Sequence, residues 1–389
     1  MKKRCTFHRS KGCKINRPVK LITEKLKMFY FGQRKIGFAV CKSCGLVFQS
    51  PSPSHKEIIK YYNKISNYFD NYYKPTPDKV KSVNRHINIV KDEINKFPEK
   101  VLEVSLLNSY NLNQFKKNGT KTVEGLEPSE IIAKNIRRKH NIVVHNSTIE
   151  KFNFRKKYDL IIMSHVLEHL FDPLKALKKC SKSQNVGQHI LVEVPLFENI
   201  ENVVNGSLYL EHLYYFSENN FLELISSAGY KTIYVSKIIE STQIPFITVI
   251  AKKIKKQELF LSNDTKEQIK NLTKYKNKNI KIWKNLQKKI NKFEKKKPIY
   301  LYGAGYHTSQ LLFYTNIEKK FKILGILDSA KVKHFGKLGN YSILPPKINM
   351  LNQKSNIIIC SLFSEETIFS SLRHFRKKGI KTYKLYGKN

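Results

Sequence analysis

Strand-like apolar runs that alternate with helical segments are the feature that most constrains the fold of this chain. From Lys100 onward the runs are KVLEV, TKTVEGLEP, YDLIIMSH, HILVEVP and PFITVIAKK, with helically spaced apolar residues between them. Such alternation predicts an α/β fold built on a parallel, doubly wound sheet. It begins again at Pro298 with PIYLYGAGY, KILGILDSA and SNIIICSL, which predicts a second, smaller Rossmann-like domain.

Shifts in composition divide these 389 residues into several parts, as expected for a chain of this length. A Pro/Ser break closes the cysteine-rich start, and Pro298 ends a Lys-rich stretch with helical spacing. We expect a small cysteine-knuckle domain, a helical connector, an α/β core, a helical linker and a C-terminal nucleotide-binding-like domain, at residues 1–54, 55–97, 98–255, 256–297 and 298–389.

The formal net charge of +42 raises the question of nucleic acid as a partner. Of the 72 basic residues 62 are Lys, and they spread along the whole chain rather than gather in one stripe. Codon usage in an AT-rich genome explains this excess at least as well as a binding face does. Nucleic-acid binding is therefore disfavoured, since it would require the lysines to lie on one face. A nucleic-acid binder would also show an affinity that falls steeply with salt.

Targeting and redox signals favour a cytoplasmic protein. No apolar run approaches the roughly 20 residues that span a bilayer, so we expect no membrane partner. The N-terminal stretch MKKRCTFHRSKGCK is basic but has no apolar run of the kind found in signal peptides. Six cysteines in so long a chain do not make a disulfide scaffold, so reduced thiols are expected.

The N-terminal cysteines are spaced as metal ligands. Cys41 and Cys44 form a C-x2-C followed by glycine, and Cys5 and His8 form a C-x2-H about thirty residues upstream. Two close pairs of sulfur and nitrogen ligands suit tetrahedral Zn²⁺ in a closed, structural site. Cys13 is an alternative to His8 as the fourth ligand.

Acids and histidines follow several of the predicted strands. Glu103 lies at the end of the first strand, and Glu127 follows the second strand 24 residues later, where an acid can accept hydrogen bonds from both ribose hydroxyls of a nucleotide. His165, Glu168 and His169 are spaced i, i+3 and i+4, which places them on one side of a helical turn. For His169, a pairing with Glu168 that only caps the turn is the simpler interpretation.

The segments VEGLEPSEIIAKNI, SHVLEHLFDP, ILVEVP and YLEHLYYFS together resemble the class I S-adenosylmethionine-dependent methyltransferases. The wider plan of cysteine knuckle, α/β core and C-terminal α/β domain is similar to that of the sugar C-methyltransferases. Those enzymes act on nucleotide-linked 4-keto-deoxysugars in deoxysugar biosynthesis. The resemblance covers nearly the whole chain and is strongest between about 120 and 230, so it implies a methyltransferase core at 98–255.

The resemblance implies a set of residues around S-adenosylmethionine. Glu127 would bind the cofactor's ribose, and Thr148 and Ile149 would lie near its adenine. The whole implied cofactor set is Glu103, Ser105, Glu127, Pro128, Thr148, Ile149 and Ser164.

The run Tyr209-x-Glu211-His212 corresponds to the family's catalytic stretch. Removal of a proton beside a carbonyl requires a base whose pKa is near 7, and a donor for the enolate that develops. His212 is then the candidate base, Tyr209 or His165 the donor, and Glu211 the residue that orients the imidazole. A packing role for the Glu211-His212 pair is the alternative.

The turn after the first strand departs from the family pattern E-x-G-x-G-x-G. Here Ser105, Leu107 and Ser109 occupy the three glycine positions, and glycine is what lets backbone approach the cofactor closely. Leu107 places a side chain where the cofactor would lie, so we expect weakened cofactor binding. The alternative function is therefore a catalytically impaired relative that binds a nucleotide-sugar or a partner protein without methyl transfer.

The C-terminal domain has glycines where the core lacks them. Gly303 and Gly305 lie between a strand and a helix, and Asp328 ends the next strand 25 residues after Gly303. This pattern predicts nucleotide binding, which in the resembling family helps to hold the nucleotide-sugar substrate. A packing scaffold with a tight turn is equally consistent with it. His307 is expected at the surface, with a phosphate contact as the alternative. The sugar, the methylated atom and the oligomeric state remain open.

Overall fold

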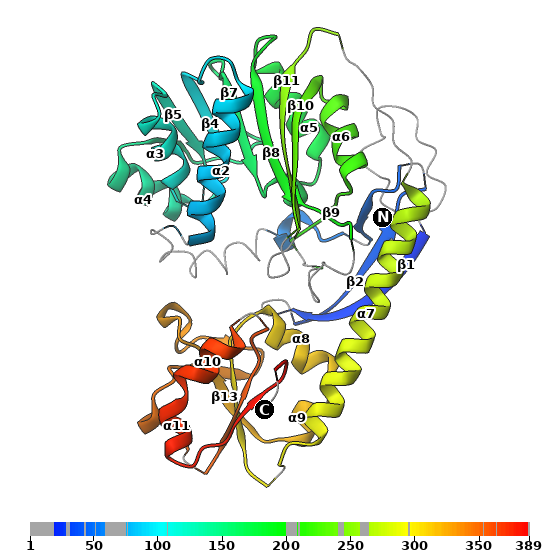
Figure 1. Cartoon of the computed structure of the whole chain (residues 1–389), viewed down its shortest axis with the longest axis vertical. Coiled ribbons are helices and arrows are strands. Elements are labelled where there is room, and N and C mark those ends of the chain that lie inside the picture. The colour runs from blue at the N-terminus through cyan, green and yellow to red at the C-terminus, as the bar shows by residue number, and fades with distance from the viewer. Residues whose placement is uncertain are drawn as a thin grey trace. The chain divides into compact units, whose positions relative to one another are not determined.

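The structure, a computed structural model, describes most of the chain and places the two predicted α/β regions in separate units (Figure 1). The described residues are 19–28, 32–42, 44–50, 52–58, 75, 77–106, 108–199, 208, 211–239, 245–256, 264–294, 296–352, 354–362 and 364–387. Five residues singled out from the sequence lie outside them, namely Cys5, His8, Cys13, Leu107 and Tyr209. The first unit comprises Met1–Ile22, Gly37–Val204 and Tyr209–Leu272, and the second Thr23–Ile36, Asn205–Leu208 and Thr273–Asn389.

A seven-stranded sheet forms the centre of the first unit, in the order β10-β11-β8-β7-β4-β5-β6. Its strands are β4 (Lys100–Val104), β5 (Thr122–Leu126), β6 (Val143–His145), β7 (Leu160–Ser164), β8 (His189–Pro195), β10 (Tyr230–Ile238) and β11 (Phe246–Lys253). The five strands from β4 to β8 run parallel, and four of them, β4, β5, β7 and β8, correspond to runs named in the sequence, whereas the short β6 was not among those runs. The last two close the sheet in antiparallel fashion, β11 against β8 and β10 against β11.

Helices cover both faces of this sheet (Figure 1). On one face pack α2 (Pro77–Glu93), α3 (Tyr110–Lys117) and α4 (Glu130–His140), and on the other α5 (Pro173–Lys182) and α6 (Glu218–Ser227). Side chains alternate between the faces: Val101 joins the α2 side and Leu102 the α5 side. Strands buried on both faces explain the continuous apolar runs in the sequence.

A small antiparallel sheet also belongs to the N-terminal part of the chain. Its strands, in spatial order, are β1 (Val19–Met28), β2 (Gly32–Val40), β3 (Val47–Gln49) and β9 (Tyr214–Tyr215). Phe38 of β2 pairs with Gln49 of β3, and Val47 of β3 pairs with Tyr215 of β9. Because β9 directly follows His212, this pairing ties the cysteine-rich start to the predicted catalytic stretch.

The second unit contains a six-stranded sheet in the order β14-β15-β13-β12-β16-β17, parallel except for β14. The strands are β12 (Ile299–Tyr302), β13 (Ile323–Leu327), β14 (Lys337–Leu338), β15 (Tyr341–Leu344), β16 (Asn356–Ile359) and β17 (Thr382–Lys384). The helices are α8 (Tyr306–Tyr314), α9 (Ile317–Lys320), α10 (Glu365–Ser371) and α11 (Arg373–Lys377). The predicted linker contains one long helix, α7 (Thr265–Asn291), whose Trp283, Leu286 and Ile290 are buried in this unit's core. No helix in the described ranges has the length and apolar character that crossing a membrane requires.

The turn after β4 is packed into the core by Leu106. Its side chain is fully buried and lies over Gly125 of the neighbouring strand β5. A Cβ built on Gly125 would lie 1.9 Å from Leu106 Cδ1. The missing side chain at Gly125 therefore makes room for Leu106, and the two residues fix the course of the turn together.

We predict that Gly125→Ala destabilises the protein by about 1–3 kcal/mol, because Leu106 must move to make room. Leu106→Ala should cost about 2–5 kcal/mol through the cavity that it leaves. The double variant should cost clearly less than the sum, because each change relieves the other. Urea unfolding followed by circular dichroism measures all three. Gly305→Ala, which meets no atom within 4 Å, is the control. Strictly additive losses would contradict the contact.

Candidate functional site

The strand order of the seven-stranded sheet indicates at which edge a ligand would bind. Parallel neighbours flank β4 on both sides, β5 on one and β7 on the other, so the direction of winding reverses between β4 and β7. Ligands of open α/β sheets bind outside the carboxyl ends of the strands at such a point. Ser105 follows β4, Glu127 follows β5 and His165 follows β7, so three of the predicted residues meet at this edge.

The turn after β4 keeps a left-handed residue without glycine. Ser105 has φ +64°, and its N–H donates to the Leu126 carbonyl at 2.7 Å. Left-handed backbone costs a residue with a side chain roughly 1–2 kcal/mol, so the surrounding structure stabilises this conformation. Asn108 accepts a hydrogen bond from the Tyr110 N–H at 3.1 Å, which closes the entry to α3. At the first of the three glycine positions, the chain therefore has the left-handed backbone that glycine readily adopts.

Glu127 lies at the end of β5 with its carboxylate turned toward the backbone. Only 5% of the residue is exposed, and the carboxylate accepts from the Ser129 N–H at 2.7 Å. Burial raises the pKa of Glu127 to about 8, although the backbone N–H groups of Ser129 and Leu106 oppose this. The Asn146 amide donates to the carbonyls of Glu127 and Pro128 and fixes this turn.

The two residues predicted beside the adenine lie in different surroundings. The Thr148 carbonyl accepts from the Phe152 N–H at 2.9 Å at the start of a turn, and Thr148 is partly exposed. Ile149 is 98% buried and packs in the core on the α5 side.

Glu103 is a buried acid at the end of β4. Lys79 of α2 lies 3.9 Å from its Oε1, whereas its buried Oε2 has no hydrogen-bond partner among the residues that the structure describes. Burial raises the pKa of Glu103, against the opposing effects of Lys79, Asn111 and His86. The carboxylate thus offers a buried acceptor at the strand edge, which suits an ammonium group of a ligand.

A buried carboxylate that the sequence analysis missed, Glu193 of β8, joins four elements. Its Oε2 accepts from Arg85 of α2 and from Thr248 of β11 at 2.6 Å, and lies 3.1 Å from His86 Nε2. Its Oε1 accepts from the Ser164 hydroxyl at 3.0 Å. Burial alone would raise the pKa of Glu193. The interactions of its carboxylate with His86 and His165 are stronger and hold this pKa well below its ordinary value. Ser164, predicted near the cofactor, is thus tied to Glu193.

His165 lies between two carboxylates. Its backbone is left-handed, with φ +55°, and its N–H donates to the Glu193 carbonyl at 2.8 Å. Nδ1 lies 3.5 Å from Glu168 Oε1, and Nε2 lies 3.4 Å from Glu193 Oε1. Burial lowers the pKa of His165, but the two carboxylates raise it by more, so the net shift is upward. With 47% of its side chain exposed, it presents an imidazolium at the strand edge.

The predicted turn with His165, Glu168 and His169 forms as a 3-10 helix, η2 (Leu167–His169). The Glu168 carboxylate is buried and lies 3.8 Å from His169 Nε2. His169 Nδ1 lies 3.1 Å from the Glu211 carbonyl oxygen, so the η2 turn contacts the predicted catalytic stretch.

His212 stands beside this pair, with its ring centroid 4.8 Å from that of His169. Burial, and then the neighbouring His169, lower the pKa of His212 to about 3 against the attraction of Glu168. This lies well below the expected pKa near 7, although the residue is only partly buried. The Gln49 side chain of β3 donates to the His212 carbonyl at 2.8 Å and positions the residue from the small sheet.

Ligating atoms of Glu168, His169 and His212 all lie within 4.8 Å of one another, so this group could hold a metal ion. The knuckle offers a second set. Cys41 and Cys44 are both buried, and the Gly45 N–H donates to the Cys41 carbonyl at 2.9 Å. The zinc site stays a prediction, since the other proposed ligands lie outside the described residues.

In the second unit, Asp328 approaches the glycine turn. Its Oδ2 accepts from the Ala304 N–H at 2.8 Å and lies 3.0 Å from Lys333 Nζ, and its Oδ1 accepts from the Ala330 N–H at 2.8 Å. Gly303 has φ +109°, which explains glycine at this position. Gly305 precedes α8 with open space around it. Nucleotide binding by Gly303, Gly305 and Asp328 remains a prediction.

His307 was expected at the surface, but the structure shows it partly buried. Its ring stacks on Trp283 of α7, with centroids 5.2 Å apart, and its Nε2 contacts the Tyr386 hydroxyl. Burial lowers the pKa of His307 to about 4, so it is a neutral packing residue.

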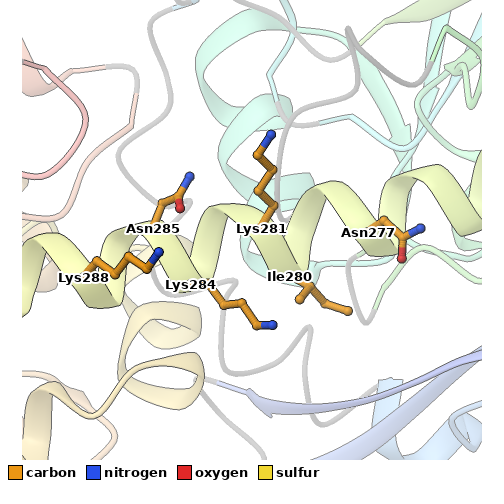
Figure 2. A pocket seen from close by; sticks show the side chains of 6 residues that line it. All are labelled: Asn277, Ile280, Lys281, Lys284, Asn285 and Lys288. Carbon is orange, nitrogen blue, oxygen red and sulfur yellow. The ribbon is translucent and has the colours of Figure 1, made fainter.

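A hollow of about 310 Å³ lies along α7 and contains none of the predicted site residues. Figure 2 shows its lining, which consists of Asn277, Ile280, Lys281, Lys284, Asn285 and Lys288. These side chains occupy the face of α7 opposite the buried Trp283 and Leu286.

Comparison with known proteins gives a match for part of the first unit. Residues 84–235, from α2 into β10, match a family model described as "Methyltransferase domain". With the sheet described above, this match supports a class I S-adenosylmethionine-dependent methyltransferase fold for that part of the chain. No match was found among curated proteins.

Solved structures that are similar include three proteins of low sequence identity. The N-methyltransferase NodS of Bradyrhizobium japonicum is 10% identical, with a TM-score of 0.40 over 49% of this chain and 97% of NodS. An S-adenosylmethionine-dependent methyltransferase of Clostridium acetobutylicum is 15% identical, with a TM-score of 0.39 over 50% and 99% of the two chains. The [4+2]-cyclase SpnF is 9% identical, with a TM-score of 0.42 over 52% and 97%.

We predict that Glu193→Gln lowers stability by about 3–5 kcal/mol at pH 7, because it leaves Arg85 without its buried counter-charge. The folded-state pKa of Glu193 is depressed, so its stabilisation is complete above the unfolded pKa of about 4.3 and is lost progressively as the pH falls from there toward the folded-state pKa. The difference between wild type and variant should therefore shrink from pH 7 to pH 3.5. Melting temperatures measure it, with exposed Glu130→Gln as control. A difference in melting temperature between wild type and Glu193→Gln that does not change with pH would contradict this account.

Proposed function

We propose that this protein is an S-adenosylmethionine-dependent methyltransferase that acts on a nucleotide-linked (deoxy)sugar and methylates carbon through an enolate. One observation supports it most directly: His165, His169 and His212 surround the buried Glu168 at the carboxyl edge of the sheet. This cluster lies within the part of the chain that matches a methyltransferase domain. Grouped imidazoles around a buried acid suit proton transfer in a confined site.

The residues at the strand edge fit the cofactor. The buried Oε2 of Glu103, which has no hydrogen-bond partner in the described part of the chain, suits its amino group, and the Glu127 carboxylate suits its ribose hydroxyls. Ser105 maintains the backbone turn between these two acids, and Pro128, Thr148, Ile149 and Ser164 complete the proposed set. When bound, S-adenosylmethionine supplies an electrophilic methyl group on sulfur. The chain's own contribution is to position it and to exclude water.

His212 is the proposed base. A pKa of about 3 keeps the imidazole neutral at pH 7, so a ring nitrogen can accept the proton from the carbon beside the substrate carbonyl, but it makes His212 a weaker base than a pKa near 7 would. Glu168 joins Glu211 as a candidate for orienting the ring. The His165 imidazolium, with a raised pKa, is the proposed donor to the enolate oxygen, and Tyr209 is a second donor.

The remaining predicted parts complete the proposal. Gly303, Gly305 and Asp328 are assigned to the nucleotide-sugar, and Cys41 and Cys44 to a structural Zn²⁺ with Cys5 and His8. The rival function is a relative that binds its ligand without methyl transfer, on the ground that the turn after β4 has no glycine. Product analysis distinguishes the two.

We predict that the purified protein methylates nucleotide-linked 4-keto-deoxysugars, and that His212→Ala lowers kcat by about 10²–10⁴-fold because proton removal loses its base. Transfer of a labelled methyl group, followed by mass spectrometry, measures turnover and locates the new methyl group. His140→Ala, on the exposed end of α4, is the matched control. Unchanged turnover in His212→Ala would refute the base assignment. Absence of methyl transfer with cofactor bound would favour the rival function.

We predict that freshly purified protein contains one zinc ion per chain, and that Cys44→Ser loses it because one of four ligands is removed. His169→Asn should retain the zinc, since the knuckle and the histidine cluster are separate donor sets. Elemental analysis after dialysis gives the stoichiometry. Zinc lost from His169→Asn but not from Cys44→Ser would instead place the metal at Glu168, His169 and His212.

A further inference from the structure

A basic hollow beside the edge strand β6 lies apart from the catalytic cluster. Its volume is about 570 Å³, and its lining comes from α4, β6 and the loop that leads from β6 toward β7. Four lining residues are cationic, namely Arg137, Lys151, Arg155 and Lys156, and no acid is among the lining residues. Like charges gathered in one concavity repel each other, and an anion in it would relieve that repulsion.

A buried carboxylate beneath the hollow fixes part of its wall. Glu124 of β5 is 2% exposed, and it accepts from the Tyr158 hydroxyl at 2.8 Å. It also lies 2.8 Å from His145 Nε2 and accepts from the Lys156 ammonium. Burial opposes its charge, but the hydrogen bonds from these three partners outweigh burial and lower the pKa of Glu124. His145, Lys156 and Tyr158 are therefore held in place by one ionised group.

The remaining cations differ in how they are held. Arg137 donates from one guanidinium nitrogen to the Val144 carbonyl at 3.0 Å, which points it across the edge strand. The exposed side chains of Lys151 and Arg155 make no hydrogen bond or ion pair within the described part of the chain. Arg137 and Lys156 are thus held in position, and Lys151 and Arg155 are available to contact a ligand.

An aromatic ring adds a flat apolar surface to this charge. Phe152 lines the hollow with its ring centroid 4.9 Å from that of His145. The rings of Phe152 and Phe154 stand edge to face at 5.0 Å, which holds Phe152 in place. Cations beside an aromatic face suit a phosphate group attached to a planar base.

We propose that the hollow of Arg137, Lys151, Phe152, Arg155 and Lys156 binds a diphosphate-bearing ligand of the nucleoside diphosphate class. The three net positive charges of four cations over the buried Glu124 match the charge of a diphosphate. The hollow shares no residue with Gly303, Gly305 and Asp328, to which the nucleotide-sugar is assigned above, so binding belongs to the hollow only if variants of its lining lose it. Ligand binding at this site can be measured directly, without any assay of methyl transfer.

Calorimetric titration of the full chain with uridine diphosphate and with inorganic pyrophosphate tests this site. Both should bind, and Lys151→Gln/Arg155→Gln should weaken both by about ten-fold because two charge contacts are lost. Lys116→Gln/Lys117→Gln removes two exposed cations from α3 and is the charge-matched control, which should bind as wild type does. Phe152→Leu should weaken the binding of uridine diphosphate more than that of pyrophosphate, because only uridine diphosphate has a base to contact the ring.

Three outcomes would overturn the proposal. The first is no binding of either probe at millimolar concentration in 50 mM salt. The second is an equal loss in both double variants, which would mean that only net charge matters. The third is a single-stranded RNA oligonucleotide that binds far more tightly than uridine diphosphate, with a steep salt dependence that the Lys151→Gln/Arg155→Gln variant reduces. That result would assign the hollow to nucleic acid.

Discussion

The candidate site depends on one buried charge, the carboxylate of Glu193. It connects α2, β7, β8 and β11 through Arg85, Ser164 and Thr248, and its backbone carbonyl fixes the left-handed turn at His165. Such a charge is tolerated in a core only when its partners satisfy it. The helix before the first parallel strand is therefore an integral part of the site, because it supplies the Arg85 guanidinium that compensates the acid.

A second constraint comes from the small antiparallel sheet. Gln49 of β3 holds the His212 carbonyl, and the β3–β9 pairing aligns the residues that follow. The cysteine turn between β2 and β3 packs closely, since a Cβ on Gly45 would lie 2.6 Å from Asp264. Because the cysteine turn leads into β3, and Gln49 of β3 holds the His212 carbonyl, a change at this turn would reach the proposed base through the small sheet.

The sequence was sufficient for the parts of the fold and site that local pattern determines. Four of the five parallel strands, the acid after β5 and the turn carrying His165 and Glu168 follow from apolar runs and spacing, whereas the three-residue strand β6 is too short to show as an apolar run. Glu193 was missed because its partners lie 108 and 55 residues away, at Arg85 and Thr248. His307 was misplaced for the same reason, since Trp283 of another helix covers it. The lowered pKa of His212 arises from burial, which spacing does not encode.

The central claim is that the turn without glycine still binds the methyl donor, with Glu127 on its ribose. Calorimetric titration with S-adenosylhomocysteine between pH 7 and pH 8.5 tests it directly. Hydroxyl donors favour the ionised carboxylate, so a Glu127 pKa of about 8 predicts micromolar binding at pH 8.5 that is roughly ten-fold weaker at pH 7. Glu127→Gln should remove this pH dependence. No binding at millimolar ligand, or an unchanged pH dependence in Glu127→Gln, would contradict the account.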